Sequence, residues 1–425
     1  MKKLALKKDV NLFTLVMYGI GVIVGAGIYV IIGKAAAMTG NSLWMAFMVS
    51  FFVGGFTAMS YAELSSMFSK DASIYHYTQN AFRKEWVSVT MTLGEIAGNI
   101  IGAAAVSLGF AAYFSAVFGT PYIWNALGLV ILMSLVNLKG IKESTILTIF
   151  MTSAEVLGLI LIIVFGIPHW GSVNYMEMPS GAFGVFSAAA LIFFAFLGFE
   201  DIVNMSEETR NAKKVVPKAL LISLAISSIL YILVSISVVS IVDWRTLGQS
   251  EAPLKLVAGQ ILGSLSPIMS FIILFSTGGT VLILLLSGSR MLYGLSEAGK
   301  LPKAFSQING KTRTPHFSVL LTMVLVFAFV MMESVEFVAK ITDFMAFAIF
   351  ALVNLSNIVL RYRRPDIKRE FKSPLSIGKL PVLSLMGFLS CLAMIFFLEL
   401  DVILVGALVL VDAAGLLVLW KRMKR

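Results

Sequence analysis

The chain has 425 residues, of which 58% are hydrophobic and 13% are charged, whereas about a quarter of the residues of a soluble domain are charged. Because one core cannot bury so much apolar surface, the composition excludes a soluble globular protein and predicts an all-α membrane protein. One cysteine, Cys391, and three histidines argue against a disulfide, a metal centre or another cofactor. The net charge of +10 matters through its distribution, and we expect no nucleic acid partner.

Twelve apolar stretches are long enough to cross a bilayer as helices, and they are bounded by basic clusters, proline or glycine. They cover residues 11–38, 42–68, 87–118, 122–138, 144–167, 182–206, 217–242, 265–297, 316–332, 337–361, 381–399 and 402–420. We therefore predict one membrane domain over residues 1–425, with twelve transmembrane helices joined by short connections.

The basic residues are distributed unevenly between the two sides that these spans define. A cytoplasmic N-terminus places nearly all of the 33 lysines and arginines on the cytoplasmic side. The basic residues left outside are Lys34, Arg245, Lys255 and Lys340. By the positive-inside rule we predict a multi-pass protein of the plasma membrane with both termini in the cytoplasm.

Two spans carry helix-breaking residues near their centres. The first span reads GIGVIVGAGIYVIIG, and the sixth reads FFAFLGFED, in which Gly198 precedes two acids. Small residues also let helices pack closely, and we prefer that explanation for Gly19 and Gly33. For Gly25, Gly27 and Gly198 we predict unwound backbone, because a freed backbone inside a membrane needs protein, water or ligand as a partner.

The two interrupted spans occupy equivalent places in two five-helix halves. The halves are residues 11–167 and 182–361, and residues 381–420 add two further helices. Paired interruptions of this kind are typical of inverted-repeat transporters with a site at the midplane. Amide groups that begin a half-helix can hold a carboxylate, and free carbonyls can hold an ammonium. The pattern therefore favours a zwitterionic ligand.

Five stretches in order along the chain resemble the amino acid/polyamine/organocation superfamily of transporters, which share the leucine-transporter fold. They are GIGVIVGAGIYVIIG, SYAELSSMFSK with IYHYTQNAF, FFAFLGFEDIVNMSEETRNAKKVVPKAL, GSRMLYGLSEAGKLPKAF and LVNLSNIVLRYRRPDIKREFKSP. The resemblance implies five-plus-five inverted repeats, unwound first and sixth helices, and amino acid transport by alternating access.

The resemblance also implies roles for particular residues. The substrate carboxylate is expected at Gly25, Ala26 and Gly27, and its ammonium at the carbonyls of Ile23, Phe194, Ala195 and Leu197. Phe196 matches the aromatic lid of the sixth span. Selectivity in such relatives depends partly on the third span, where Gly98, Asn99 and Gly102 are the candidates. We favour neutral amino acids, with cationic amino acids or polyamines as the alternative because Glu95 and Glu200 could pair with a cationic group.

Carboxyl groups at membrane depth are functional candidates by default, and Glu95, Glu155 and Glu200 are the candidates for coupling. Glu155 matches a position where some relatives carry a lysine in place of a sodium ion. We expect it to exchange a proton or to help hold a cation. The alternative is a permanently protonated glutamate that hydrogen-bonds a neighbouring helix. Transport is thus expected to be proton-coupled or ion-independent, as uptake or exchange.

Glu63 and Arg290 lie near the predicted cytoplasmic ends of the second and eighth spans. We predict that they belong to a charge network that closes an inner gate, although snorkelling of Arg290 to the headgroups is a simpler explanation. The sequence has no metal cluster, no Ser–His–Asp set and no phosphate-binding loop, which argues against an enzyme. A non-transporting amino acid sensor is the remaining alternative, but the soluble output domain expected of one is missing.

Overall fold

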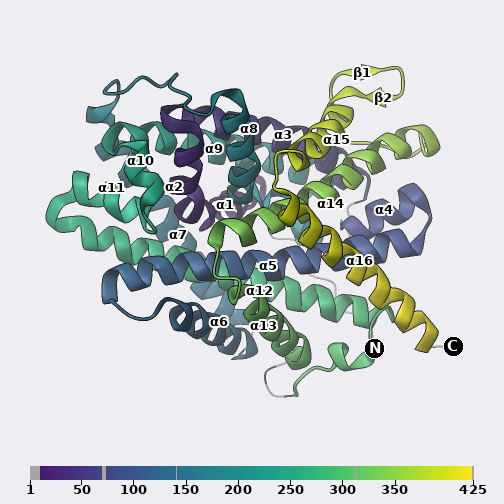
Figure 1. The fold of residues 1–425 in the computed structure, drawn as a ribbon. Coiled ribbons are helices and arrows are strands. Elements are labelled where there is room, and N and C mark those ends of the chain that lie inside the picture. The colour runs from purple at the N-terminus through teal and green to yellow at the C-terminus, as the bar shows by residue number, and fades with distance from the viewer. Residues whose placement is uncertain (1–9, 69–72, 140, 311, 313, 424–425) are drawn as a thin grey trace.

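A computed structural model describes residues 10–68, 73–139, 141–310, 312 and 314–423. The described chain is almost entirely helical (Figure 1). Its longer helices are α1 (Leu12–Ile23), α2 (Gly27–Thr39), α3 (Leu43–Met67), α5 (Glu85–Phe118), α6 (Tyr122–Lys139), α7 (Ile141–Gly166), α8 (Gly181–Ile192), α9 (Ala212–Ile241), α12 (Ser266–Glu297), α13 (His316–Val330), α14 (Val335–Arg363), α15 (Val382–Ile395) and α16 (Leu400–Met423). Each predicted span thus contains at least one helix.

Short elements join these helices. They are α4 (Ile74–Phe82), α10 (Trp244–Gln249), α11 (Pro253–Leu262), the 3₁₀ helices η1 (Gly40–Ser42), η2 (Ile167–His169), η3 (Phe193–Phe196), η4 (Phe199–Glu207), η5 (Gly263–Leu265) and η6 (Lys303–Ser306), and the strands β1 (Ser376–Ile377) and β2 (Leu380–Pro381). The strands form an antiparallel hairpin. In Figure 1, α10 and α11 lie at one end of the bundle, and α4 and the hairpin lie at the other. We call these the α10 end and the α4 end.

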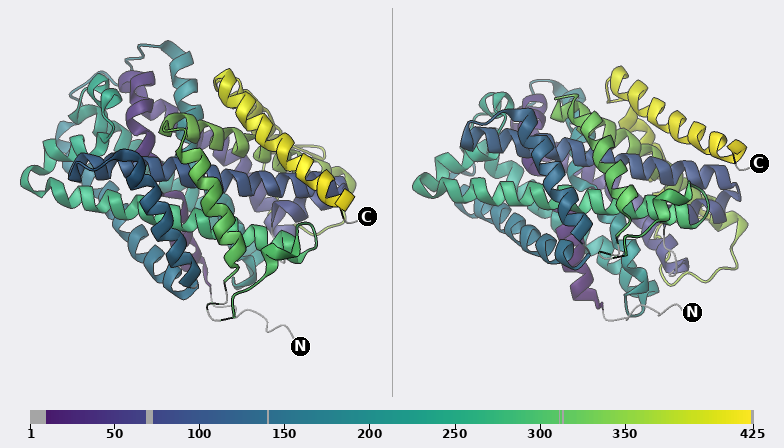
Figure 2. Two further views of the ribbon diagram at one scale, coloured as in Figure 1. Left: turned by 60° about the horizontal axis from the view of Figure 1, so that its bottom comes forward. Right: turned by 90° about the horizontal axis from the view of Figure 1, so that it is seen from below.

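The chain is a multi-pass membrane protein. Within the described residues, eight helical segments are long and apolar enough to cross a bilayer. Large apolar side chains also lie on the outside of the bundle, among them Phe13, Trp124 and Val411, each at least 65% exposed. Such a surface suits lipid and not water. Figure 2 shows α16 along the outside of the bundle, where it packs against α14 and α5.

The helical stretch of residues 12–39 is interrupted between α1 and α2. Val24, Gly25 and Ala26 separate the two helices, and Val24 has non-helical dihedral angles. The span of residues 181–207 is interrupted as well, because α8 is followed by η3, an extended Leu197 and then η4. Gly198 has a φ of 107°, a conformation that side chains with a Cβ rarely adopt. We refer to these interruptions as the first break and the second break.

Small residues bring the helices close together around the first break. The Cβ of an alanine at Gly109 of α5 would lie 2.2 Å from the Cγ2 of Val30 on α2. An alanine at Gly27 would meet the Cα of Ala195 at 2.7 Å. The glycines therefore let α2 pack directly against α5 and against η3.

We predict that Gly109→Ala lowers the free energy of unfolding by about 1–3 kcal/mol, because the added methyl group overpacks the contact with Val30. Thermal unfolding of the protein in detergent measures this change. Gly55→Ala is the matched control, since no atom lies within 4 Å of its added Cβ. Equal unfolding temperatures for the two variants would contradict the close packing of α2 on α5.

Candidate functional site

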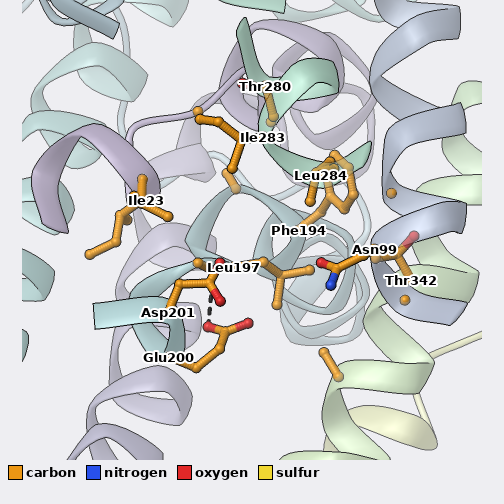
Figure 3. Close-up of a pocket in the computed structure, with 18 of the residues that line it drawn as sticks. Ile23, Asn99, Phe194, Leu197, Glu200, Asp201, Thr280, Ile283, Leu284 and Thr342 are labelled. Carbon is orange, nitrogen blue, oxygen red and sulfur yellow. Dashed lines mark hydrogen bonds between the residues drawn. The ribbon is translucent and has the colours of Figure 1, made fainter. Parts of the chain in front are cut away.

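A cavity lies against both breaks, and Figure 3 shows the side chains that surround it. The space between its lining atoms, including the part open to solvent, is about 910 Å³. The predicted site residues that line it are Ile23, Gly25, Gly27, Glu95, Gly98, Asn99, Gly102, Phe194, Ala195, Leu197 and Glu200. Segments far apart in the sequence therefore meet around one space, and both breaks contribute backbone to it.

Amide groups at the first break are partly satisfied by the protein. The amide of Ala26 donates to the Oγ1 of Thr280 on α12 at 3.0 Å. The amide of Gly25 donates to the carbonyl of Ile23 at 2.7 Å. The following amides, which begin α2, have no acceptor in the preceding turn because the helix starts there. The positive end of the α2 dipole therefore lies at the cavity wall, where Gly27 lines the space.

The hydroxyl of Tyr231 on α9 connects the two breaks. It lies 2.7 Å from the carbonyl oxygen of Ile23 and 2.8 Å from that of Ala195, and it donates its proton to one of them at a time. Tyr231 itself is fully buried. Two of the carbonyls predicted to hold a substrate ammonium thus already have a partner. The other two belong to Phe194 and Leu197, and both residues line the cavity.

Phe196 occupies a different place from the predicted lid. Its ring is fully buried and lies in a T-shaped contact with Tyr231, with ring centroids 5.3 Å apart. It also packs against Phe47 at 6.3 Å. The aromatic side chain of the second break that lines the cavity is Phe194 (Figure 3). Phe196 therefore holds the second break against α3 and α9 in this structure.

The three candidate selectivity residues of α5 all face the cavity, which the sequence alone could not show. A Cβ at Gly102 would meet Thr342 at 3.5 Å and the ring of Phe194 at 3.8 Å. The amide nitrogen of Asn99 lies 3.4 Å from the Oγ of Ser287 on α12. Glycine at position 102 therefore keeps space open between α5, α14 and the second break.

Three carboxyl groups line one part of the cavity, and no lysine or arginine lines it with them among the described residues. Glu200 accepts a hydrogen bond from the amide of Gly198 at 2.9 Å, so its carboxylate caps the start of η4. Asp201 accepts one from the amide group of Asn204 at 3.0 Å. Glu95 lies within electrostatic range of both acids. Glu95 and Asp201 are thus the acids best placed to meet a ligand.

Glu155 lies outside the cavity, between α7, α12 and α2. Its side chain accepts a hydrogen bond from the hydroxyl of Ser276, and its backbone carbonyl accepts one from the hydroxyl of Tyr29 at 2.6 Å. The residue is only 2% exposed. Tyr29 belongs to the first turn of α2, so Glu155 is connected to the first break without touching the cavity.

Glu63 belongs to a buried charge network at the α4 end, but with other cations than the predicted Arg290. Arg361 donates to both of its oxygens, at 2.8 and 2.6 Å, and Arg369 donates at 3.0 Å. The amide of Ser373 completes the set at 2.9 Å. Arg290 is exposed and interacts electrostatically with Tyr18 on α1 instead. The network fastens the loop after α14 across the ends of α3 and α14.

The cavity lies toward the α4 end of the breaks, and the α10 end is closed by close packing. An alanine at Gly33 would place its Cβ 2.6 Å from the carbonyl of Leu247, and one at Gly248 would meet Ala37 at 2.6 Å. These contacts join α2 to the segment of α10 and α11. On the other side, the exposed Tyr18 interacts electrostatically with Asp201 of the cavity and with Arg290.

A family model described as amino acid permease matches residues 10–410. The chain therefore belongs to the amino acid permease family, within the amino acid/polyamine/organocation superfamily. The family and its cavity between broken helices define a membrane transporter for small molecules and not an enzyme.

The relatives of this chain are named for different substrates. The chain is 30% identical to the branched-chain amino acid permease BcaP of Bacillus subtilis (strain 168), over 92% of this chain and 88% of the relative. It is 28% identical to the methylthioribose transporter of the same organism, over 90% and 87%. It is also 28% identical to the vacuolar cationic amino acid transporter 2 of Arabidopsis thaliana, over 83% of this chain and 59% of that protein. Similarity alone thus supports amino acid transport without selecting a substrate.

We predict that Glu63→Gln lowers the free energy of unfolding by about 3 kcal/mol, because it leaves two buried guanidinium groups without their carboxylate. Thermal unfolding in detergent reports the change. Asp366→Asn is the control, since Asp366 is 69% exposed and its pair with Arg364 should contribute less than about 1 kcal/mol. A Glu63→Gln protein as stable as the control would refute the network's structural role.

We also predict that Tyr231→Phe lowers the free energy of unfolding by about 1–3 kcal/mol, because two buried carbonyls lose their shared donor. Tyr362→Phe is the matched control, because Tyr362 is 52% exposed. The comparison uses the same thermal unfolding measurement. An unchanged Tyr231→Phe protein would mean that the hydroxyl does not hold the two breaks together.

Proposed function

We propose that this protein is a secondary active amino acid transporter that works by alternating access. In this proposal the twelve predicted spans form two inverted repeats of five, residues 11–167 and 182–361, followed by two further helices within 381–420. The observation that supports it most strongly is one cavity lined by both breaks, in a chain of the amino acid permease family. Backbone groups freed from a helix inside a membrane suit a small zwitterion.

The α4 end is the cytoplasmic end in this proposal, because most basic residues lie on that side. The cavity lies toward that end and the α10 end is packed shut, so the structure corresponds to an inward-facing form. In the outward-facing form, α2 would have to separate from α5 and from the segment of α10 and α11. Both termini are then cytoplasmic, and the membrane is the plasma membrane.

The substrate is a neutral amino acid in our primary proposal. Its carboxylate lies at the first turn of α2, and its ammonium lies near the carbonyls of Phe194 and Leu197. The side chain extends toward apolar groups of α12 and α14, where Ile283, Leu284 and Met345 line the cavity. The relative named for branched-chain amino acids supports this choice.

A cationic amino acid is the second candidate, and the acids of the cavity support it. Glu95 and Asp201 line the space without a basic partner among the described lining residues. A substrate ammonium or guanidinium there would gain a charge-assisted hydrogen bond that a neutral side chain cannot make. The relatives named for cationic amino acids agree with this alternative.

Coupling in this proposal involves the proton. Glu155 bonds α12 through Ser276 and adjoins Tyr29 of α2, so a change in its protonation alters contacts of the first break. An ion-independent exchanger would instead use Glu155 as a fixed link between α7 and α12. The two alternatives differ in whether a proton gradient drives accumulation.

The test is uptake of radiolabelled leucine, valine, lysine and arginine into proteoliposomes, with and without an inward proton gradient and with sodium replaced by choline. We expect leucine or valine to accumulate with the gradient and independently of sodium. Glu155→Gln should reduce the gradient response at least tenfold. Glu95→Gln should leave leucine uptake within about twofold and would abolish lysine uptake only if the cationic alternative holds.

If the wild type prefers lysine or arginine and Glu95→Gln loses this preference, the proposal of a neutral substrate is replaced by that of a cationic one. Movement only into preloaded vesicles would establish exchange in place of proton-driven uptake. Absence of uptake and exchange for every amino acid tested would contradict the proposed function.

A further inference from the structure

A carboxyl group behind the cavity wall has no conventional partner. Asp343 on α14 is fully buried, and neither of its carboxylate oxygens makes a hydrogen bond in the described structure. An ionised carboxylate at such a place costs several kcal/mol unless it is paired. Asp343 is also an acid at membrane depth, where ionisable groups are functional candidates by default. The residue therefore requires an explanation that the substrate site does not supply.

On one side, Asp343 adjoins the wall of the cavity. Its chain neighbour Thr342 lines the space together with Asn99 and Phe194 (Figure 3). The backbone amide of Phe194, in the second break, is near enough to interact electrostatically with the Asp343 carboxyl group, although the two form no hydrogen bond. Asp343 itself does not line the cavity. It is thus placed to act on the break and not on the substrate.

On the other side, a row of ionisable groups leads from Asp343 toward the α10 end. Lys340 lies one turn earlier on the same face of α14, and its Nζ lies 2.6 Å from Glu336 and 2.5 Å from Glu399. The Lys340 side chain is 5% exposed, whereas those of Glu336 and Glu399 are 31% and 54% exposed. A partly exposed acid, Glu336, and an exposed acid, Glu399, are therefore linked to a buried lysine, and that lysine interacts electrostatically with Asp343.

The beginning of α14 belongs to the α10 end of the bundle. Val335 lines a small second cavity together with Glu251 and Pro253, which adjoin α10 and α11. The row from Glu336 to Asp343 thus connects that end with the second break. The substrate cavity lies toward the opposite end. Asp343 therefore lies between this row and Phe194, which lines the substrate cavity.

The carboxyl groups of this row outnumber its cations, so one of them can bind a proton. Three carboxyl groups, those of Glu336, Glu399 and Asp343, share the single ammonium of Lys340. Among the described residues, Lys340 is the charged group that acts on Asp343, and η3 contributes the Phe194 amide. The neighbouring contact between η3 and α14 is apolar, with the rings of Phe193 and Phe347 4.6 Å apart. No other described cation neutralises Asp343 from these elements.

We propose that Asp343 carries the proton that is transported with the substrate, an inference that rests on the proposed amino acid carrier. The Lys340 ammonium gives one proton to Asp343, so that an N–H bond breaks as an O–H bond forms on the carboxylate. The Lys340 amine then takes up a proton that outside water supplies through Glu336 and Glu399. After the cavity opens to the cytoplasm, the O–H bond on Asp343 breaks and the proton leaves to cytoplasmic water, which restores the carboxylate. The ionised Asp343 carboxylate attracts the Phe194 amide more strongly than the neutral carboxylic acid does. Protonation of Asp343 therefore changes the contact between the second break and α14.

The experiment compares wild type with Asp343→Asn in proteoliposomes, using tritiated leucine and tritiated lysine as probes. One arm measures accumulation driven by an inward proton gradient, with the membrane potential clamped at zero. The other arm measures exchange into preloaded vesicles without a gradient. Asp343→Asn should show at least tenfold less gradient-driven accumulation than wild type, whereas its exchange rate should stay within about twofold of the wild-type rate. Asp401→Asn, an exposed acid at the start of α16, is the matched control and should behave as wild type.

Normal gradient-driven accumulation by Asp343→Asn would overturn the inference and leave the proposed function standing. Loss of both gradient-driven accumulation and exchange, in a variant with an unchanged unfolding temperature, would also overturn the inference, because Asp343 would then be a residue that positions the substrate site. A wild type that exchanges but ignores the gradient excludes any proton carrier. If Asp343→Asn does not fold, Lys340→Gln tests the inference instead. Lys340→Gln should reduce gradient-driven accumulation at least tenfold and retain exchange, and normal gradient-driven accumulation would overturn the inference. A wild type without either activity contradicts the carrier itself.

Discussion

The structure depends on how backbone groups freed from two broken helices are satisfied inside an apolar bundle. A carbonyl or amide left alone there costs several kcal/mol, so each break needs partners from other helices. The hydroxyl of Tyr231 serves the carbonyls of both breaks, and Thr280 serves the amide of Ala26. Both breaks also contribute residues to the wall of one cavity. In the proposed carrier, backbone groups of the same two breaks hold the carboxylate and the ammonium of the substrate.

The acids of the protein separate into three environments with different consequences. Glu63 is paired with two arginines and fastens a loop at the α4 end. Glu95 and Asp201 line the cavity, where no described lining residue is basic, and in the proposed carrier they influence which substrates bind. Glu155 and Asp343 are buried beside the first and second breaks, respectively, and neither lines the cavity. In the proposed carrier both breaks rearrange during transport, so protonation at these two places would be coupled to the movement of the substrate.

Local sequence patterns predicted the breaks, whereas the contacts that complete the site could not be predicted. Gly25, Gly27 and Gly198 are recognisable because helix breakers stand out inside apolar spans. Tyr231 is separated from Ile23 by 208 positions, so no local pattern connects them. Glu63 binds Arg361, 298 positions away, and sequence gives no reason to prefer it over Arg290. The inward faces of α5 likewise follow from packing and not from periodicity, because the spans are apolar all round.

The most direct test of the account is whether an amino acid occupies the cavity between the breaks. Replacing the single cysteine, Cys391, by alanine provides a background in which Asn99→Cys can be labelled with a membrane-impermeant thiol reagent. If the substrate binds between the breaks, reagent applied from the cytoplasmic side will modify position 99, and a transported amino acid will slow this modification at least tenfold. Modification at the same rate with and without every amino acid tested would contradict a substrate site at the two breaks.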